Sequence, residues 1–535
     1  VRFNAAAAAT TTTTTTTTTT KIHFANIANQ HSNNNNNNNN LNIFSEQQRR
    51  QQQQSATTVN MWRSAQLRRF ATMPPCSFVP EQYHGPKASD VLAARKKSLN
   101  PSLTSNLFYS KPLYVTQGHM QWLWDEEGRR YLDMFAGIVT VSVGHCHPKV
   151  TAAAEKQLRT LWHTSNIYLT RPVHEFADKL TAKLPGDLKV CYFVNSGSEA
   201  NDLAMMMMRA YTGAWDVISL RNAYHGMNPY CASLCAVSSY KRHQPGNFGV
   251  HHAMNADPYR GVWGGSACRD SPVQPDRSCH CPIGSCRAAD QYAAQFRDLL
   301  EHSVPAKKVA GFFAESIQGV GGTVQFPKGY LKQVYAMVRA RGGLCVADEV
   351  QTGFGRLGSH FWGFEAHGVT PDIVTMAKGI GNGFPLAAVV TTPAIAATLA
   401  EANFFNTFGG NPVACAIGSS VLDVIDESKL AENCADVGGY MLLKLKKLKE
   451  RFAIVGDVRG KGLMIGVELV EDADTRKPLP AEMMAKLMDL SRERGVLLGR
   501  GGNYGNVLRI KPPMCVTRED ADFTVAVLEE CLNEV

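Results

Sequence analysis

The sequence contains no run of eighteen consecutive apolar residues, so it offers no candidate for a membrane-spanning helix. It also has little charge excess over most of its length. Of the net charge of +9, residues 1–80 supply +6, because seven Arg and Lys residues but only one acid, Glu46, fall there. Residues 81–535 therefore carry +3. This ordinary value gives no reason to expect a nucleic-acid or membrane partner.

Residues 1–60 have few of the apolar residues that a folded core needs. They contain a threonine run (10–20), an asparagine run (33–40) and several glutamines. Such tracts bury little apolar surface, so we expect disorder there. Because the first methionine is Met61, we interpret residues 1–60 as translated upstream sequence and Met61 as the natural start.

Acidic residues are absent from residues 61–80. The same segment holds three arginines (Arg63, Arg68 and Arg69), hydroxyl residues and an amphipathic stretch. This composition is typical of a mitochondrial transit peptide, and an ordinary basic tail is the alternative. We therefore expect the mature protein in the mitochondrial matrix.

Cysteines are not clustered in most of the chain. They lie mostly singly inside apolar stretches, as at Cys191, Cys345 and Cys415, which indicates buried thiols in a reducing compartment. The exception is a Gly-, Pro- and Ser-rich stretch that contains Cys268, Cys279, Cys281, Cys286 and His280. Its spacing fits no zinc pattern, so we assign no metal and interpret it as a surface insertion, with a metal or disulfide loop as the alternative.

From residue 130 onward, short β-rich runs alternate with helical patterns. This alternation predicts an α/β fold in which helices cover a mostly parallel sheet. One predicted helix spans 330–341 and ends at a pair of glycines. The predicted strands are 190–193, 217–220, 309–313, 344–347 and 373–376. In such sheets ligands bind beyond the carboxyl ends of the strands, so polar residues there are candidates for chemistry.

Three of the segments that follow predicted strands carry such residues. The segment 195–198 leads from a strand into a helix and could bind phosphate through N–H groups and hydroxyls, although an ordinary helix cap has the same pattern. Asp348 could pair with a protonated pyridine nitrogen, or it could be a cap or part of a salt bridge. Lys378 enters a glycine-rich loop from an apolar strand, as either a desolvated nucleophile or a surface lysine.

Taken together, these segments resemble the class III, or ω-type, pyridoxal-phosphate (PLP) aminotransferases. The resemblance covers about residues 85–535 and rests mainly on 348–356, 378–385 and 406–412. Within the family, other segments are most similar to the mitochondrial alanine–glyoxylate group. These segments are 137–148, 161–165, 268–274 and 317–320.

The resemblance implies the fold-type I architecture of PLP-dependent transferases. It implies a large PLP-binding domain of residues 135–400 and a small α+β domain built from residues 81–134 and 401–535, the latter including an interface segment. It also implies a homodimer or homotetramer with active sites at the subunit interface. Pyridoxal 5′-phosphate is the implied cofactor.

The resemblance assigns roles around the cofactor ring. Lys378 would bind PLP covalently and move protons, and Asp348 would keep the ring nitrogen protonated. Tyr224 would stack on the ring, and Gln351 would lie near its phenolic oxygen. Glu315 would support Asp348 and the surroundings of the cofactor.

The remaining site residues concern phosphate and substrate. Gly197 and Ser198 match the phosphate-binding pair, and Thr407 matches a threonine that reaches the phosphate of the other subunit. Arg509 matches the arginine that binds the α-carboxylate of the substrate, although by itself it could be a surface residue of a strand.

The expected activity is a ping-pong transfer of the amino group of L-alanine to glyoxylate, with β-amino acids such as 3-aminoisobutyrate as further donors. The alternatives are an ornithine- or γ-aminobutyrate-type transaminase, a PLP phospho-lyase acting on phosphoethanolamine-like amines, and a non-enzymatic homologue. Intact Lys378, Asp348 and Arg509 argue against the last.

Three features depart from the wider family pattern. Ser316 replaces a proline, Val320 replaces an acid found in the ornithine and γ-aminobutyrate enzymes, and the stretch 261–290 is longer and rich in cysteine. The acid is thought to mask the arginine matching Arg509. Val320 cannot do so, which favours small α-amino donors.

Overall fold

The computed structural model describes residues 71–105, 108–241, 249–277, 281, 286–305 and 309–535. These residues belong to one compact unit, Phe70–Val535. The low-complexity segment 1–60 and residues 61–70 of the expected transit segment lie outside the described residues.

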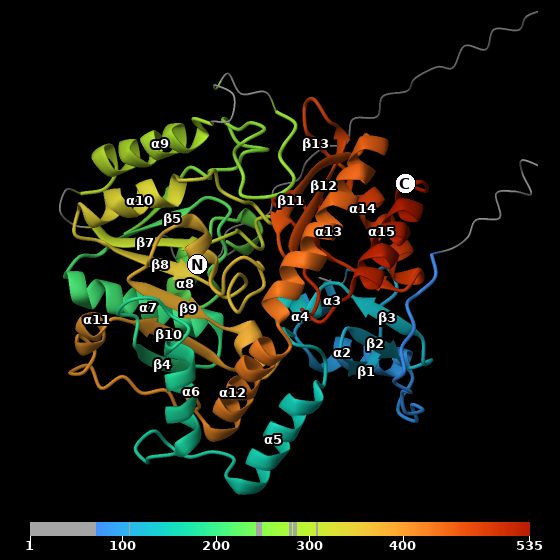
Figure 1. The fold of residues 1–535 in the computed structure, drawn as a ribbon, viewed down its shortest axis with the longest axis horizontal. Coiled ribbons are helices and arrows are strands. Elements are labelled where there is room, and N and C mark those ends of the chain that lie inside the picture. The colour runs from blue at the N-terminus through green and yellow to red at the C-terminus, as the bar shows by residue number, and fades with distance from the viewer. Residues whose placement is uncertain (1–70, 106–107, 242–248, 278–280, 282–285, 306–308) are drawn as a thin grey trace, which may run out of the picture. The chain divides into compact units, whose positions relative to one another are not determined.

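Seven strands of the described chain form a central sheet in the order β4-β10-β9-β8-β7-β5-β6 (Figure 1). Strand β10 runs antiparallel to both of its neighbours, and all other pairs are parallel. The mostly parallel sheet is therefore confirmed. The strands are β4 (Val190–Val194), β10 (Ala387–Thr391), β9 (Ile373–Met376), β8 (Leu344–Asp348), β7 (Val309–Glu315), β5 (Asp216–Leu220) and β6 (Val250–Ala253).

All five predicted strands are present, and the small differences in their ends matter for function. Strand β7 extends to Glu315 and β8 extends to Asp348, so both carboxylates are the last residues of neighbouring strands. The predicted helix over 330–341 was two residues too long, because α10 (Tyr330–Arg339) is followed by a tight turn in which Gly342 takes the left-handed conformation.

Helices cover both faces of this sheet because its strands are apolar on both sides. In β7, Phe312 packs with α9 (Ala288–His302) and α10, whereas the next residue, Phe313, packs in the cluster that contains α7 (Gly197–Thr212). Successive side chains of a strand point to opposite faces, so an uninterrupted apolar strand fills two cores.

Two smaller sheets complete the described fold. One has the order β1-β2-β3-β14, and in it β14 pairs in parallel with β3, which brings segments from near the two ends of the chain together. The other has the order β11-β12-β16-β15, with β13 on β12. These strands are β1 (Val115–His119), β2 (Trp122–Asp125), β3 (Arg130–Asp133), β11 (Val455–Lys461), β12 (Met464–Asp472), β13 (Lys477–Pro478), β14 (Val496–Leu497), β15 (Gly499–Gly501) and β16 (Val507–Ile510).

None of the helices in the described ranges is long and apolar enough to cross a membrane. The helices not yet named are α2 (Ala88–Ser98), α3 (Ser102–Ser105), α4 (Ala136–Val139), α5 (Pro148–Thr160), α6 (Arg171–Thr181), α8 (Pro229–Leu234), α11 (Pro393–Ala397), α12 (Pro412–Glu427), α13 (Leu430–Arg451), α14 (Ala481–Glu493) and α15 (Arg518–Leu532), with 3₁₀ turns η1 (Ser238–Tyr240), η2 (Gly363–His367) and η3 (Lys378–Gly381).

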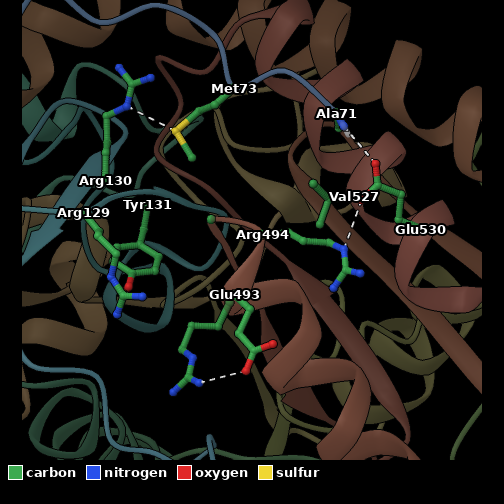
Figure 2. Close-up of a pocket in the computed structure, with 11 residues that line it drawn as sticks. Ala71, Met73, Arg129, Arg130, Tyr131, Glu493, Arg494, Val527 and Glu530 are labelled. Carbon is green, nitrogen blue, oxygen red and sulfur yellow. Dashed lines mark hydrogen bonds and ion pairs between the residues drawn. The ribbon is translucent and has the colours of Figure 1, made fainter. Parts of the chain in front are cut away.

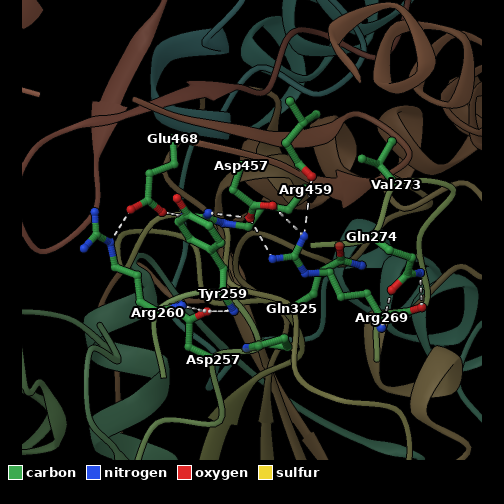
Figure 3. A network of polar contacts seen from close by, with 12 residues as sticks. Asp257, Tyr259, Arg260, Arg269, Val273, Gln274, Gln325, Asp457, Arg459 and Glu468 are labelled. Carbon is green, nitrogen blue, oxygen red and sulfur yellow. Dashed lines mark hydrogen bonds and ion pairs between the residues drawn. The ribbon is translucent and has the colours of Figure 1, made fainter. Parts of the chain in front are cut away.

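A buried network of charges ties the long insertion after β6 to β11 and β12 (Figure 3). The Arg269 guanidinium donates two hydrogen bonds to Asp457, at 3.1 and 2.7 Å, and Arg459 donates to the same carboxylate at 2.9 Å. Arg459 and Arg260 both pair with Glu468. Burial alone would raise the pKa of Asp457, but Arg269 and Arg459 hold that pKa below its usual value. The first part of the predicted surface insertion is therefore anchored in the interior.

The cysteine-rich part of the insertion is partly described. Cys268 is buried, and Cys281 and Cys286 are half-buried, whereas Cys279 and His280 lie outside the described residues. Backbone N–H groups of the insertion donate to the Cys281 and Cys286 sulfurs. Within the described parts of the chain, no group of three or more His, Cys, Asp or Glu side chains is arranged to hold a metal ion.

Candidate active site

Lys378 begins the 3₁₀ turn η3, directly after β9 and Ala377. Its φ of 53° lies in the left-handed region, which non-glycine residues rarely adopt and which is often found at functional sites. The segment 142–144 holds this turn in place. Ser142 Oγ donates to the Gly379 carbonyl at 2.7 Å, and the Asn382 side chain bonds the backbone of Val143 and Gly144. Two sequence segments that carried the family resemblance therefore form one structure.

Asp348 is buried at the end of β8 and is held by two side chains from other elements. His225 Nδ1 lies 2.7 Å from Asp348 Oδ2, and Asn201 Nδ2 donates to the same oxygen at 2.9 Å. Thr375 donates in turn to the Asn201 amide oxygen at 2.7 Å. The other carboxylate oxygen, Oδ1, accepts only the Val350 N–H at 3.1 Å among the contacts of the described chain. It therefore keeps a lone pair for a further donor.

Glu315 ends β7 beside Asp348 in register, and its hydrogen bonds go to backbone groups near the site. Its carboxylate accepts the backbone N–H groups of Tyr224 at 3.2 Å and of Gly319 at 2.6 Å. Instead of bonding Asp348, Glu315 fixes the loop that carries Tyr224. The Tyr224 ring packs edge-on against Tyr240, with ring centroids 5.1 Å apart.

Gln351, Arg509 and Lys511 form a cluster of buried polar groups. Arg509 Nη2 lies 3.0 Å and Lys511 Nζ 3.3 Å from the Gln351 amide oxygen. The two cations are two residues apart around the end of β16, and the Arg509 guanidinium lies over the Phe135 ring at 5.1 Å. No described carboxylate forms a salt bridge with either cation, and Arg509 Nε has no hydrogen-bond partner in the described structure.

Burial and neighbouring charge shift the pKa values of these groups in ways that favour anion binding. Burial and the nearby Arg509 lower the pKa of Lys378 to about 8, against the opposing pull of Asp348 and Glu315. Burial lowers the pKa of Arg509 to about 10. Burial, and to a lesser extent the charge of Arg509, holds the pKa of Lys511 well below its usual value. An anionic ligand would supply the opposite charge that these basic groups lack.

The predicted phosphate-binding pair lies in the first turn of α7. Ser196 caps this helix by accepting the Glu199 N–H at 3.2 Å, so Gly197 and Ser198 are the first two helical residues. Ser198 Oγ accepts the Met227 N–H at 3.1 Å. A Cβ on Gly197 would lie 3.2 Å from the Val350 side chain, so glycine permits a close approach of α7 to the residues after β8. The start of α7 can bind an anion.

Thr407, in the loop before α12, is exposed. Its neighbour Asn406 accepts hydrogen bonds from Asn195 Nδ2 at 3.0 Å and from the Gly409 N–H at 2.8 Å. The loop is thus fixed next to the start of α7, while the Thr407 hydroxyl remains available for a contact outside the chain.

Comparisons with known proteins agree with this arrangement. The family model described as Aminotransferase class-III matches residues 107–532. The chain belongs to the class III aminotransferases.

Curated relatives match most of this class III aminotransferase. It is 58% identical over 463 residues to "Alanine--glyoxylate aminotransferase 2, mitochondrial" of Homo sapiens, covering 86% of this chain and 90% of the relative. It is 48% identical over 465 residues to a homologue of that protein in Arabidopsis thaliana, also named mitochondrial, covering 87% and 92%. The described enzyme is accordingly assigned to the mitochondrion.

Solved structures include transaminases and a lyase. An (S)-enantioselective ω-transaminase from Thermomicrobium roseum is 32% identical with a TM-score of 0.74, and the match covers 84% of this chain and 99% of that one. A phospholyase from Arthrobacter in complex with phosphoethanolamine is 35% identical with a TM-score of 0.73, covering 83% and 100%. The fold is therefore shared by enzymes of two reaction types.

Class III aminotransferases use pyridoxal phosphate, and the residues of this enzyme fit that group. The Lys378 amine, whose pKa is lowered, the open lone pair on Asp348 and the start of α7 match an aldehyde, a ring nitrogen and a phosphate respectively. Gly226 adds a second close approach, because a Cβ there would lie 2.4 Å from Ser198 Oγ.

His225, Asn201 and Lys511 also belong to the site, although no role was predicted for them. Each contacts a partner more than a hundred residues away in the sequence. Only Lys511 had a usable signal, namely its spacing of two from Arg509 at a strand end.

Segment Ala136–Val139 lies just before the segment 142–144 that holds η3, and its backbone has an unusual conformation. Its four residues form a left-handed turn, with φ of 51°, 59°, 67° and 65°. Left-handed conformation is unfavourable for branched residues such as Ile138 and Val139. The N–H groups of Phe135 and of Ala136, the first residue of the turn, both donate to Asp133 and hold the turn beside the Phe135 ring and Arg509.

Proposed function

We propose that this enzyme transfers the amino group of L-alanine to glyoxylate, giving pyruvate and glycine. The observation that carries the proposal is the grouping of Lys378 and Asp348, at the carboxyl ends of neighbouring strands of the central sheet, with Arg509 from β16, whose charge acts on the Lys378 amine. The names of the most similar curated relatives support the choice of substrates.

Lys378 would bind the cofactor covalently and transfer the proton of the substrate α-carbon. Bound pyridoxal phosphate supplies an electron-accepting ring that makes this proton acidic. A lysine whose pKa is lowered to about 8 is partly neutral at physiological pH, so it can act as nucleophile and then as base. Its position at the start of η3 keeps the amine near Asp348.

Asp348 would hold the ring-nitrogen proton through its Oδ1 atom. His225 and Asn201 fix Oδ2, and therefore the carboxylate orientation. Gly197 and Ser198 would bind the phosphate, and Tyr224 would stack on the ring, an offset contact that contributes about 1 kcal/mol. Gln351 offers its amide N–H₂ to the phenolic oxygen because its amide oxygen is engaged by Arg509 and Lys511.

Arg509 would bind the substrate carboxylate through its guanidinium, which presents two parallel donors. Lys511 lies within reach of the same amide oxygen, and a bound carboxylate would favour its charged form, which would strengthen carboxylate binding. Val320 leaves Arg509 unmasked. Its carbonyl accepts the Gly502 N–H at 3.0 Å, and a Cβ on Gly501 would touch both this carbonyl and the Arg509 side chain.

We further propose that the enzyme is a homodimer, or a homotetramer built from such dimers, in which Thr407 completes the phosphate site of the second subunit. Exposed apolar side chains accompany Thr407 in sequence, at Phe405 and Phe408, and another group lies at Trp162 and 167–169. Exposed apolar groups of this kind favour burial in an interface.

Elimination of phosphate from phosphoethanolamine-like amines is the second candidate, because a phospholyase shares the fold at 35% identity. One experiment separates the two. Purified enzyme with pyridoxal phosphate is given L-alanine and glyoxylate, or phosphoethanolamine alone, and pyruvate, glycine and inorganic phosphate are measured. Pyruvate and glycine in equal amounts support transamination. Phosphate release without pyruvate formation would overturn it.

A further inference from the structure

The first residues of the described chain are packed onto the folded enzyme although they form no helix or strand. Ala71, Met73, Cys76 and Phe78 all pack against the main apolar core. The Phe78 ring stacks on His119, with centroids 4.4 Å apart. Removing residues 71–78 would therefore expose apolar surface, whereas the expected transit segment nominally extends to residue 80.

Ala71 and Met73 lie in a pocket of the folded enzyme and make specific contacts there (Figure 2). Arg130 donates to the Pro74 carbonyl at 2.6 Å, and its Nε lies 3.3 Å from the Met73 sulfur. The Met73 methyl occupies the place where a side chain on Gly495 would be, since a Cβ there would lie 2.3 Å from it. These contacts line a pocket of about 390 Å³.

The Ala71 nitrogen faces an acidic group in that pocket. It donates to Glu530 Oε1 at 2.8 Å, and Arg494 Nε donates to Glu530 Oε2 at 3.0 Å (Figure 2). Arg494 also pairs with Glu534 at 2.6 Å. Two carboxylates thus share one guanidinium, and the carboxylate oxygen that faces Ala71 is well placed for a second cation. A peptide N–H is uncharged and forms a weaker hydrogen bond with this oxygen than an ammonium group, whose bond would be charge-assisted.

We propose that Ala71 is the N-terminus of the mature enzyme and that its α-ammonium group binds Glu530. A peptidase that processes imported precursors would hydrolyse the bond between Phe70 and Ala71. Water supplies the hydroxyl for the new Phe70 carboxylate and the proton for the new amine, so no other reactant is needed. The inference does not depend on the proposed substrates.

The sequence beside this bond suits such a cut. Arg68 and Arg69 lie immediately before Phe70, in a segment free of acids, as expected of an import signal. Cleavage between Phe70 and Ala71 removes the basic segment and keeps the contacts that residues 71–74 make with Arg130 and Glu530.

The direct test is to express the chain in a eukaryotic cell, recover it from mitochondria and determine its N-terminal sequence. We expect Ala71-Thr72-Met73. A start at any other residue, whether within 61–70 or beyond Ala71, would overturn the proposal. Transaminase activity measured on the same sample reports on the proposed function separately.

A second test concerns the ammonium contact. Two proteins are compared, one beginning with a free Ala71 amine and one retaining residues 61–70, each with Glu530→Gln or, as a matched control, the neighbouring Glu529→Gln. We expect Glu530→Gln to speed amide exchange over residues 72–78 about fivefold in the first protein and little in the second. Equal effects in both proteins, or from both substitutions, would contradict the docking of the ammonium.

Discussion

At the residue scale, Lys378 has to be neutral to attack an aldehyde, and its surroundings decide at which pH that occurs. Burial and Arg509 lower its pKa to about 8. The fraction of neutral amine, and hence the rate of covalent PLP binding by the cofactor-free enzyme, should rise with pH through about 8. Stopped-flow absorbance measures this rate. In Arg509→Met the midpoint should move up, and a wild-type midpoint near 10 would contradict the account.

Val320 tests the account of donor choice. Val320→Glu places a carboxylate in the loop beside Arg509, where it can compete with the substrate for a charge-assisted pair. We expect kcat/KM for L-alanine to fall on the order of tenfold or more, with PLP affinity nearly unchanged. The matched control is Val320→Gln, which is similar in size but uncharged. If both variants use alanine like the wild type, an unmasked Arg509 does not determine the donor.

The residues predicted from sequence were those whose chemistry is visible locally. Asp348 ends an apolar strand and Lys378 closely follows another, and Gly197 and Ser198 begin a helix. His225 could not be assigned, because its role depends on a hydrogen bond to a residue 123 positions away. The hydrogen bonds of Glu315 could not be predicted for the same reason, since its position beside Asp348 does not reveal which N–H groups its carboxylate accepts.

At the scale of elements, the strands were predictable and the connections between sheets were not. An apolar run such as 309–313 reads as a buried strand, and the pairing of neighbours follows from the parallel α/β pattern. The hydrogen bond from Arg269 to Asp457 joins residues 188 positions apart, and no periodic pattern in the sequence predicts it. The insertion therefore looked like surface from its composition alone.

This network gives a stability prediction. Arg269→Met should destabilise the enzyme by roughly 3–5 kcal/mol, because it leaves the fully buried Asp457 with one cation instead of two. Denaturant unfolding followed by fluorescence measures the change. The control is Arg171→Met, which removes an exposed pair with Glu175 and should have little effect. Equal effects of the two substitutions would show that the insertion is not held by this network.

At the scale of the whole molecule, the proposed dimer places Lys378 and Thr407 of one active site on different subunits. Lys378→Ala and Thr407→Glu should each be nearly inactive alone. Mixed and allowed to exchange subunits, they should regain about a quarter of wild-type activity, because half of the dimers are hybrids and each hybrid has one intact site. No recovery, despite subunit exchange shown by native mass spectrometry, would mean that both residues serve the same subunit.

The central claim is that Lys378 is the residue that binds the cofactor. The enzyme is loaded with pyridoxal phosphate, reduced with borohydride to make the covalent linkage permanent, digested, and analysed by peptide mass spectrometry. The account predicts a phosphopyridoxyl group on Lys378, and no labelled peptide at any position in Lys378→Ala. A label on another lysine in the wild type, such as Lys511, would contradict it.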